Sequence, residues 1–441
     1  MSTFQPLTFA ALWESLLPIG RDDRSGGYRR FCWTPAELEC RAWFETTAAQ
    51  RDLRTHGDRN GNLWAWWDVA AGEAGADAAG PAGGSGGSLP RASTGSGGSS
   101  PRAGTAVAVG SHLDSVPDGG AFDGPLGVVC AFAAIDVLRE EGFVPARPIA
   151  VAAFAEEEGG RFGVACLGSR LLTGAIDANT ARGLRDGDGI TLAEAMRAAG
   201  HDPARIGPDE DLIARLGAYV ELHIEQGRAL ADLDAALGIG EGIWPHGRWR
   251  LDFTGRADHA GTAALAGRSD PMLPYAATVL AARQVAAQAG TLATIGKVVA
   301  EPGAANAVCS SVRAWLDARA PGAGALNDTV DRVLTAAAEA AHSHAVTLSW
   351  MQESVTPLVE FDAGLRDRLA ATLAARGIAA PALPTGAGHD AGVLAARLPT
   401  AMLFVRNPTG VSHSPAEHAE DADCLAGVTA LAAVLREMAG S

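Results

Sequence analysis

Histidine and carboxylate residues gather in four short segments of this 441-residue sequence. Each segment directly follows an apolar stretch, where a single histidine is ordinarily a packed or solvated side chain. Four such segments in one chain favour a metal site instead, because imidazole and carboxylate groups are ligands of divalent cations such as Zn²⁺. The segments are SHLDSVPDGGAFDG (111–124), AEEEGG (155–160), HIEQG (223–227) and SHSPAEH (412–418).

Three consecutive glutamates, Glu156, Glu157 and Glu158, raise an electrostatic problem. They follow the apolar stretch RPIAVAAFA (147–155), which is typical of a buried strand, and two glycines come after them. Burial of an unpaired carboxylate is costly in free energy, or it raises the pKa of the group. The run therefore predicts a strong positive partner, and the neighbouring histidine segments indicate that this partner is bound metal.

The residues that could bind metal are far apart in sequence, so a scaffold must bring them together. Short apolar strands precede the segments, and GPLGVVCAFAAIDVLREEG (124–142) has helical spacing. Strands that alternate with helices predict an α/β fold with a mostly parallel sheet. Ligands of such sheets bind beyond the carboxyl ends of the strands, where these segments lie. The expected strands are 63–70, 105–110, 147–155, 218–222 and 399–405.

Residues 238–352 follow a different pattern. Four stretches have the composition of strands and two have helical spacing, which predicts an inserted α+β domain of two helices on four strands. The catalytic domain is then expected at 1–237 and 353–441. Within the insertion, the expected strands are 248–255, 291–299, 309–319 and 345–351, and the expected helices are 271–288 and 325–344.

The composition excludes several classes of protein. Hydrophobic residues make up 47% and charged residues 20% of the chain, a balance typical of globular proteins. The net charge of −16 argues against nucleic-acid binding. No stretch has the pattern of a signal peptide or a membrane span. Six scattered cysteines without a C-x-x-C pair favour reduced thiols and a cytoplasmic location: Cys32, Cys40, Cys130, Cys166, Cys309 and Cys424.

Residues 72–104 consist almost entirely of Gly, Ala, Ser and Pro. Such a segment can bury little apolar surface, so we expect a flexible surface loop. It contains GGSGG (83–87), which matches the G-x-S-x-G pattern of serine hydrolases. We reject a serine nucleophile there, because a nucleophile elbow needs a strand before it and a helix after it.

The longer motifs resemble the M20 zinc amidohydrolases, in the branch of N-carbamoyl-L-amino acid hydrolases, allantoate amidohydrolases and β-ureidopropionases. Apart from the low-complexity segment, the resemblance covers the chain from about residue 12 onwards. It implies a zinc-aminopeptidase-like catalytic domain, an inserted dimerisation (lid) domain, two divalent metal ions per subunit and a homodimer. The matching stretches are GSHLDSVPDGGAFDGPLGV, AFAEEEGGRFG, ELHIEQGRAL, ADHAGT, GAGHDAG and SHSPAEH.

The resemblance also implies the ligands of the two metal ions. His112 and His223 bind the first ion. Glu158 and His413 bind the second ion, and Asp123 bridges both. Zinc is the implied metal, although Mn²⁺, Co²⁺ and Ni²⁺ also suit these nitrogen and oxygen ligands.

In the same family pattern, Glu157 is the general base that takes a proton from water and passes it to the leaving nitrogen. Asp114 is expected to hold the far ring nitrogen of His112. Many relatives have Asp where this chain has Glu156. A shifted assignment, with Glu156 as the base and Glu157 as the ligand, therefore stays open.

The inserted domain is implied to supply substrate contacts. His259 resembles a histidine that reaches the active site of the partner subunit and polarises the substrate carbonyl. Asn306 and Arg319 resemble the pair that holds the substrate carboxylate, a role that suits the arginine fork. The plainer alternatives are a turn residue for His259 and a surface charge for Arg319. Cys309 stands where relatives often have proline, which weakens the match at Asn306.

Three further residues complete the expected site and its surroundings. Gln226 suits the ureido end of the substrate, and His389 in GAGHDAG joins the substrate-binding set. His246 has no implied role, so we interpret it as a packed histidine.

The expected activity is metal-dependent hydrolysis of the ureido or carbamoyl C–N bond of a small carboxylate, such as an N-carbamoyl-L-amino acid or allantoate. A hydrolase of N-acyl or N-formyl amino acids or dipeptides is the alternative among enzymes. A binding or scaffold protein that lost catalysis is the alternative outside enzymes, and the complete set of five ligands and a base argues against it. We expect no nucleic-acid or membrane partner.

Overall fold

The computed structural model describes residues 8–69 and 105–440, so the loop predicted at 72–104 lies outside the described residues. The chain divides into two compact units. The first unit comprises Met1–Ile239, Asp362–Pro381 and His389–Ser441, and the second comprises Gly240–Phe361 and Ala382–Gly388. The chain thus leaves the second unit after Phe361, passes through the first unit, and returns to the second unit for the short segment Ala382–Gly388.

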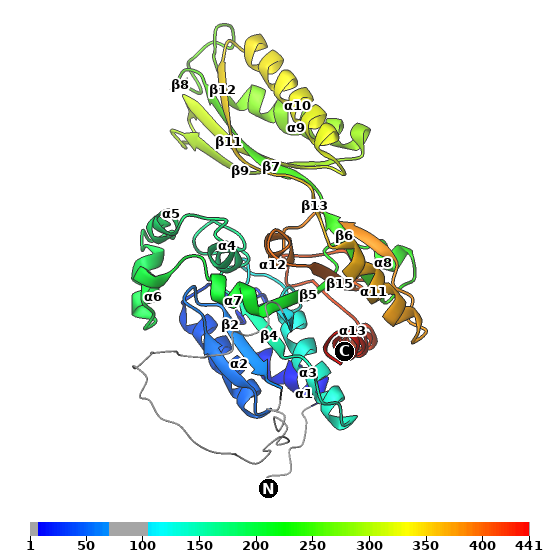
Figure 1. Ribbon diagram of the computed structural model, residues 1–441. Helices are drawn as coiled ribbons and strands as arrows, with labels where there is room; N and C mark the ends of the chain where they lie inside the picture. The colour runs from blue at the N-terminus through cyan, green and yellow to red at the C-terminus, as the bar shows by residue number, and fades with distance from the viewer. Residues whose placement is uncertain (1–7, 70–104, 441) are drawn as a thin grey trace, which may run out of the picture. The chain divides into compact units, whose positions relative to one another are not determined.

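The first unit contains a sheet with the strand order β1-β2-β4-β3-β5-β15-β6. Its four central strands, β4-β3-β5-β15, are parallel, and antiparallel neighbours flank them. The predicted α/β fold with a mostly parallel sheet is confirmed (Figure 1). The strands are β1 Arg54–Gly57, β2 Leu63–Trp67, β3 Ala106–His112, β4 Ile149–Phe154, β5 Leu216–Ile224, β6 Leu237–Ile243 and β15 Thr400–Val405.

Two hydrophobic clusters hold the first unit together. The larger cluster joins alternate residues of the sheet, such as Val107, Val151 and Val220, to α1, α2, α3, α11 and α13. The smaller cluster joins α4, α5 and α6 to Ala155 at the end of β4. The helices are α1 Phe9–Leu16, α2 Pro35–Ala49, α3 Pro125–Glu140, α4 Leu167–Thr173, α5 Ala178–Gly183, α6 Leu192–Ala198, α7 Glu210–Arg215, α8 Ala229–Asp232, α11 Ala363–Ala374, α12 Asp390–Leu394 and α13 Asp421–Ala439.

The second unit contains an antiparallel sheet of order β12-β7-β11-β9, with α9 and α10 side by side on one face (Figure 1). The α+β architecture predicted for the insertion is confirmed. Short strands β13 and β14 pair with β6, and β8 pairs with β10. The elements are β7 His246–Thr254, β8 Asp258–His259, α9 Met272–Ala289, β9 Leu292–Glu301, β10 Ala307–Val308, β11 Ser311–Arg319, α10 Ala323–Ser343, β12 Thr347–Thr356, β13 Val359–Glu360 and β14 Ala382–Thr385.

Two strands of the first unit extend further than the sequence indicated. β3 was expected to end at residue 110 and β5 at residue 222, but they continue to His112 and Ile224. Their polar ends stay in the ladder, because His112 pairs with Phe154 and His223 pairs with Phe404. Each histidine is therefore fixed by strand pairing and not carried on a loop.

Other features agree with the composition of the chain. All six cysteines are free thiols. Within residues 8–69 and 105–440, no helix is long and apolar enough to cross a membrane. His246 is half-buried at the start of β7, and its Nδ1 lies 3.0 Å from the carbonyl oxygen of Trp244.

A buried ion pair connects the end of α2 to α3. Nη2 of Arg51 lies 2.5 Å from Oδ2 of Asp136, and its Nη1 donates to the carbonyl oxygen of Thr47 at 2.9 Å. The two charged side chains are only 1% and 6% exposed. Removal of one partner leaves the other as a buried, uncompensated charge, whereas removal of both leaves an apolar contact.

We predict that Arg51→Met lowers the free energy of unfolding by roughly 3–5 kcal/mol, and that adding Asp136→Leu restores most of the loss. Urea unfolding followed by circular dichroism measures both changes. Arg54→Met is the matched control, because the Arg54–Asp68 pair is about half exposed and should contribute at most about 1 kcal/mol. An Arg51→Met variant as stable as the Arg54→Met control would contradict the prediction.

Candidate metal centre

Asp123 lies between two groups of side chains that could hold metal ions. In each group, one ligand atom per residue lies within 4.8 Å of the others. Oδ1 of Asp123 lies 3.2 Å from Nε2 of His223 and 3.7 Å from Nε2 of His112. Oδ2 lies 3.3 Å from Nε2 of His413, which in turn lies 3.4 Å from Oε2 of Glu158. Each carboxylate oxygen of Asp123 therefore faces one group.

The donor atoms of these groups fit divalent cations. Nδ1 of His112 and Nδ1 of His223 lie 3.2 Å and 2.9 Å from backbone carbonyl oxygens, which leaves each Nε2 for another partner. Nε2 of His112 and Oε1 of Glu158 are buried and have no hydrogen-bond partner among the described residues. Mixed imidazole and carboxylate donors suit Zn²⁺ and related ions, so the five residues would hold two ions that share Asp123.

The electrostatic balance of the cluster depends on contacts between histidine and Asp123. Burial alone would raise the pKa of Asp123, but the nearby imidazoles of His112, His223 and His413 hold it well below its usual range. Burial opposes protonation of His112, but Glu157, Asp114 and Asp123 together raise its pKa well above the usual value. The hydrogen bond to Asp123 raises the pKa of His413 to about 9. The carboxylates of the cluster thus favour the protonated forms of His112 and His413, and the histidines favour the ionised form of Asp123.

The three consecutive glutamates point to different partners. Glu156 has a left-handed backbone (φ +53°), and its Oε1 accepts the N–H groups of Arg161 and Phe162 at 2.9 and 2.6 Å. Oε2 of Glu157 lies 3.6 Å from Nε2 of His112, whereas Glu158 faces His413. Burial raises the pKa of Glu156 to about 8 and that of Glu158 to about 7, and it raises the pKa of Glu157 well above its usual value. A nearby cation would favour the ionised forms of these carboxylates.

Asp114 fixes the backbone of this acidic run. Its two carboxylate oxygens accept the N–H groups of Glu157 and Glu158, each at 3.1 Å. The sequence predicted that the side chain of Asp114 holds His112, but the ring nitrogen lies closer to the backbone oxygen of Asp114 (3.2 Å) than to its carboxylate (3.6 Å). Asp114 therefore connects the end of β3 to the residues that follow β4.

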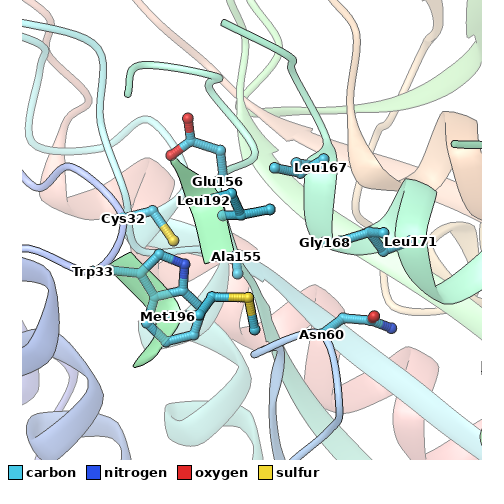
Figure 2. Close-up of a pocket in the computed structure, with 10 residues that line it drawn as sticks. All are labelled: Cys32, Trp33, Asn60, Ala155, Glu156, Leu167, Gly168, Leu171, Leu192 and Met196. Atoms are coloured by element: carbon cyan, nitrogen blue, oxygen red, sulfur yellow. The ribbon is translucent and has the colours of Figure 1, made fainter. Parts of the chain in front are cut away.

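A small pocket borders the acidic run, and Glu156 is the one residue of the run that lines it (Figure 2). The cavity has a volume of about 10 Å³, roughly the space for one water molecule. Oε2 of Glu156 has no hydrogen-bond partner in the described part of the chain. The pocket is distinct from the groups around Asp123. Its other lining residues are Cys32, Trp33, Asn60, Ala155, Leu167, Gly168, Leu171, Leu192 and Met196.

Two residues predicted to bind substrate lie next to the metal-ligating groups. Nε2 of Gln226 donates to Oδ2 of Asp123 at 2.8 Å and lies 3.3 Å from Nε2 of His413. The buried ring of His389 lies 4.5 Å from that of His223, and burial lowers its pKa well below the usual value. His389, His223 and Glu221 form a third group with ligand atoms within 4.8 Å, although both oxygens of Glu221 accept protein donors.

The residues predicted in the insertion belong to the second unit. His259 on β8 pairs with Ala307 on β10, and the carbonyl oxygen of Asn306 accepts the N–H of Ala260 at 3.0 Å. His259 and Asn306 are thus neighbours, and both are exposed. Arg319 ends β11, where its Nε donates to Asp317 at 2.9 Å and its Nη1 donates to the carbonyl oxygen of Gly386 at 2.5 Å. Arg319 therefore already has partners within its own unit.

Sequence reasoning did not identify Glu417, which holds the backbone of Asp123 in place. Its buried Oε2 accepts the N–H groups of Phe122 and Asp123, each at 3.0 Å, and Ser412 donates to its Oε1 at 3.2 Å. Burial raises the pKa of Glu417 to about 7. The sequence feature that could have identified Glu417 is its position in the motif SHSPAEH, four residues after His413.

Two other signals were present in the sequence. Glu221 is a charged residue inside the apolar strand AYVEL, and it connects Ser111 Oγ (2.9 Å) to the N–H of Ala391 (2.8 Å). Gly124 follows Asp123 with φ +85°, and a Cβ at this position would come within 2.4 Å of the imidazole of His112. The glycine thus allows the backbone after Asp123 to pass close to the imidazole of His112.

Comparisons with known proteins agree with this arrangement. The model of peptidase family M20/M25/M40 matches residues 108–437. An N-carbamoyl-L-amino acid amidohydrolase from Geobacillus stearothermophilus is 33% identical over 426 residues, which cover 95% of this chain and 96% of the relative. An allantoate amidohydrolase from Escherichia coli K12 is 29% identical over 428 residues, or 95% of this chain and 94% of the relative.

A solved structure extends the comparison to the fold. A hydantoinase/carbamoylase family amidase from Burkholderia ambifaria superposes with a TM-score of 0.76 at 29% identity, covering 99% of this chain and 98% of that one. The family resemblance inferred from the motifs is confirmed.

We predict that the two groups around Asp123 lose metal separately. His413→Ala should retain the ion of the His112–His223 group and lose the other, whereas Asp123→Ala should lose both because it supplies an oxygen to each. Elemental analysis of the purified, metal-loaded variants measures the stoichiometry. His418→Ala, an exposed histidine paired with Glu420, is the control and should retain both ions. Full occupancy in Asp123→Ala would refute a shared carboxylate.

Proposed function

The chain belongs to peptidase family M20/M25/M40, in the hydantoinase/carbamoylase branch of hydrolases that act on non-peptide C–N bonds, and we propose that it hydrolyses the carbamoyl group of N-carbamoyl-L-amino acids or the ureido group of allantoate. The observation that carries the proposal is the position of Asp123 between two ligand groups, with Glu157 beside the first. The names of the two curated relatives supply the substrate class.

Glu157 is the proposed general base. When bound, the two cations would supply Lewis acidity, which lowers the pKa of water and polarises a carbonyl. Glu157 takes a proton from the attacking water as the water adds to the carbamoyl carbon. The bond to the amino nitrogen then breaks, and Glu157 returns the proton to that nitrogen. The released carbamate decomposes to carbon dioxide and ammonia, so one water yields the amino acid, CO₂ and NH₃.

The arrangement of the acidic run supports this assignment over the shifted one. The backbone N–H groups of Arg161 and Phe162 both donate to Oε1 of Glu156, so this carboxylate is held by its own neighbours in the chain. Glu158 faces His413 and Asp123 faces the same histidine, so these two complete one ligand group. Glu157 lies beside His112 and is not part of the group formed by Asp123, Glu158 and His413.

The substrate contacts are proposed from the family pattern. Gln226, which touches Asp123 and His413, is placed to contact the ureido end. Asn306 and Arg319 would hold the substrate carboxylate, and Arg319 would then share its guanidinium with Asp317. His259 would act across a dimer, as a donor to the substrate carbonyl in the partner subunit. His389, kept neutral by burial, would contact the substrate beside His223.

A substrate panel tests the proposal against its main alternative. The metal-loaded protein is incubated with allantoate and with N-carbamoyl, N-formyl and N-acetyl amino acids, and ammonia, formate and acetate are measured. Ammonia from the carbamoyl or ureido substrates is the expected result. Release of formate or acetate alone would instead identify an N-acyl amino acid hydrolase. Absence of any hydrolysis by protein with full metal content would favour a binding protein.

We predict that Glu157→Gln retains both metal ions but loses roughly 10²–10⁴-fold in kcat, because the amide cannot accept the proton from water. Steady-state kinetics and elemental analysis check the two parts. Glu156→Gln is the comparison variant, and it should keep far more activity. The opposite pattern, in which Glu157→Gln loses a metal and Glu156→Gln loses activity with metals bound, would support the shifted assignment.

We also predict that two inactive variants complement each other in a mixed dimer. His259→Ala removes the donor and Glu157→Gln removes the base, so a mixed dimer holds one site with both groups intact. Refolding the two variants together should recover part of the wild-type activity, measured against each variant refolded alone. If His259 is only a turn residue, His259→Ala will be nearly fully active and mixing will add nothing.

A further inference from the structure

We propose that Cys166 is a positioning residue whose thiol orients the carboxylate of Glu157. Sγ of Cys166 lies 3.3 Å from Oε1 of Glu157, in a contact that is buried on both sides. The other oxygen of Glu157, Oε2, faces Nε2 of His112 at 3.6 Å. The thiol therefore holds the oxygen that points away from His112. The inference rests on the role of Glu157 in the proposed function.

The backbone of Cys166 holds the same residue. Its N–H donates to the carbonyl oxygen of Glu157 at 2.6 Å, and the next two N–H groups, of Leu167 and Gly168, donate to Glu156 and Ala155 at 3.0 and 2.9 Å. Cys166 and the start of α4 thus donate to the carbonyl groups of Ala155 and of two residues of the acidic run, Glu156 and Glu157. Cys166 contacts Glu157 at two points, the carbonyl oxygen and the carboxylate.

The conformation of Cys166 is the second observation. It precedes α4 in the left-handed region, at φ +54° and ψ 36°, which costs free energy for a residue with a Cβ. Glycine would adopt this conformation without strain. The Cβ is what places the sulfur against Glu157, so the strain accompanies a specific contact. The carbonyl oxygen of Cys166 accepts a hydrogen bond from Ser169 Oγ at 3.1 Å, which fixes the turn further.

A buried cysteine elsewhere in the same unit shows a different environment. Cys130 lies inside α3 with no exposed surface, and its thiol donates only a long hydrogen bond of 3.9 Å to the carbonyl oxygen of Cys424. Cys130 packs as a small apolar side chain. Its replacement by alanine is therefore a matched control for the loss of a buried thiol.

Kinetics of three variants test the role of the thiol. Cys166→Ala removes the sulfur and with it the donor, and kcat should fall roughly 10- to 100-fold with KM and metal content little changed, as expected for a misplaced base. Cys166→Ser restores a donor and should recover a large part of the loss. Cys166→Gly relieves the backbone strain without restoring a donor, so it should resemble alanine. Cys130→Ala should keep the wild-type kcat.

A spectroscopic measurement tests the contact without any substrate. A thiol that donates to a carboxylate has a lower S–H stretching frequency than one in an apolar environment. The difference spectrum of wild type minus Cys166→Ser should contain such a shifted band, and the band should move to higher frequency in the Glu157→Gln background, because an amide is a weaker acceptor. A band at the same frequency in both backgrounds would refute the hydrogen bond.

The two measurements separate the possible failures. Wild-type kcat in Cys166→Ala, or Cys166→Ser no more active than Cys166→Ala, would overturn the inference while the proposed function stands. Loss of hydrolysis from the whole substrate panel would overturn the proposed function. The S–H spectrum would then still decide whether Cys166 holds Glu157.

Discussion

Compensation of buried negative charge is the constraint on which this site depends. Asp123, Glu157, Glu158 and Glu417 all lie in or beside one cluster, and all but Asp123 have pKa values raised by burial. Asp123 is the exception because the imidazoles of three histidines lie against its carboxylate. A fold that gathers these acids must therefore also gather the histidines. The parallel pairing of β3 and β5 does so by placing His112, the last residue of β3, and His223, the last but one of β5, at the same edge of the sheet.

The backbone around the acidic run is as constrained as its charges. The carboxylate of Asp114 accepts two N–H groups of the run, and the side chain of Asn62 accepts the N–H of Ala155 at 3.0 Å. Cys166 and the start of α4 donate to the carbonyl groups of Ala155, Glu156 and Glu157. Three non-glycine residues of the centre, Glu156, Cys166 and His413, have left-handed backbones. Such conformations persist where the surroundings over-determine them. The acidic run can thus present three adjacent carboxylates in three directions without moving.

Sequence reasoning predicted the features that depend on local pattern. The central strands, the α+β insertion and the positions of the histidine and carboxylate segments at strand ends follow from apolar periodicity and from the motifs. The partners of buried groups did not follow, because they depend on long-range packing. Glu417 bonds to residues almost three hundred positions away, and Arg319 pairs with Asp317 and with Gly386, which returns to the second unit after the chain has left it. Such groups come together only when distant segments of the chain pack against each other in the folded protein.

The division of the chain separates two kinds of chemistry. Every side chain that contacts Asp123 belongs to the first unit, whereas His259, Asn306 and Arg319 belong to the second. Apart from His413, which is about half exposed, the candidate metal ligands have buried side chains, and a change at one alters the charge balance of the others. His259 and Asn306 are exposed. If these residues recognise substrate as proposed, specificity can change through the second unit while the charge balance of the first stays intact.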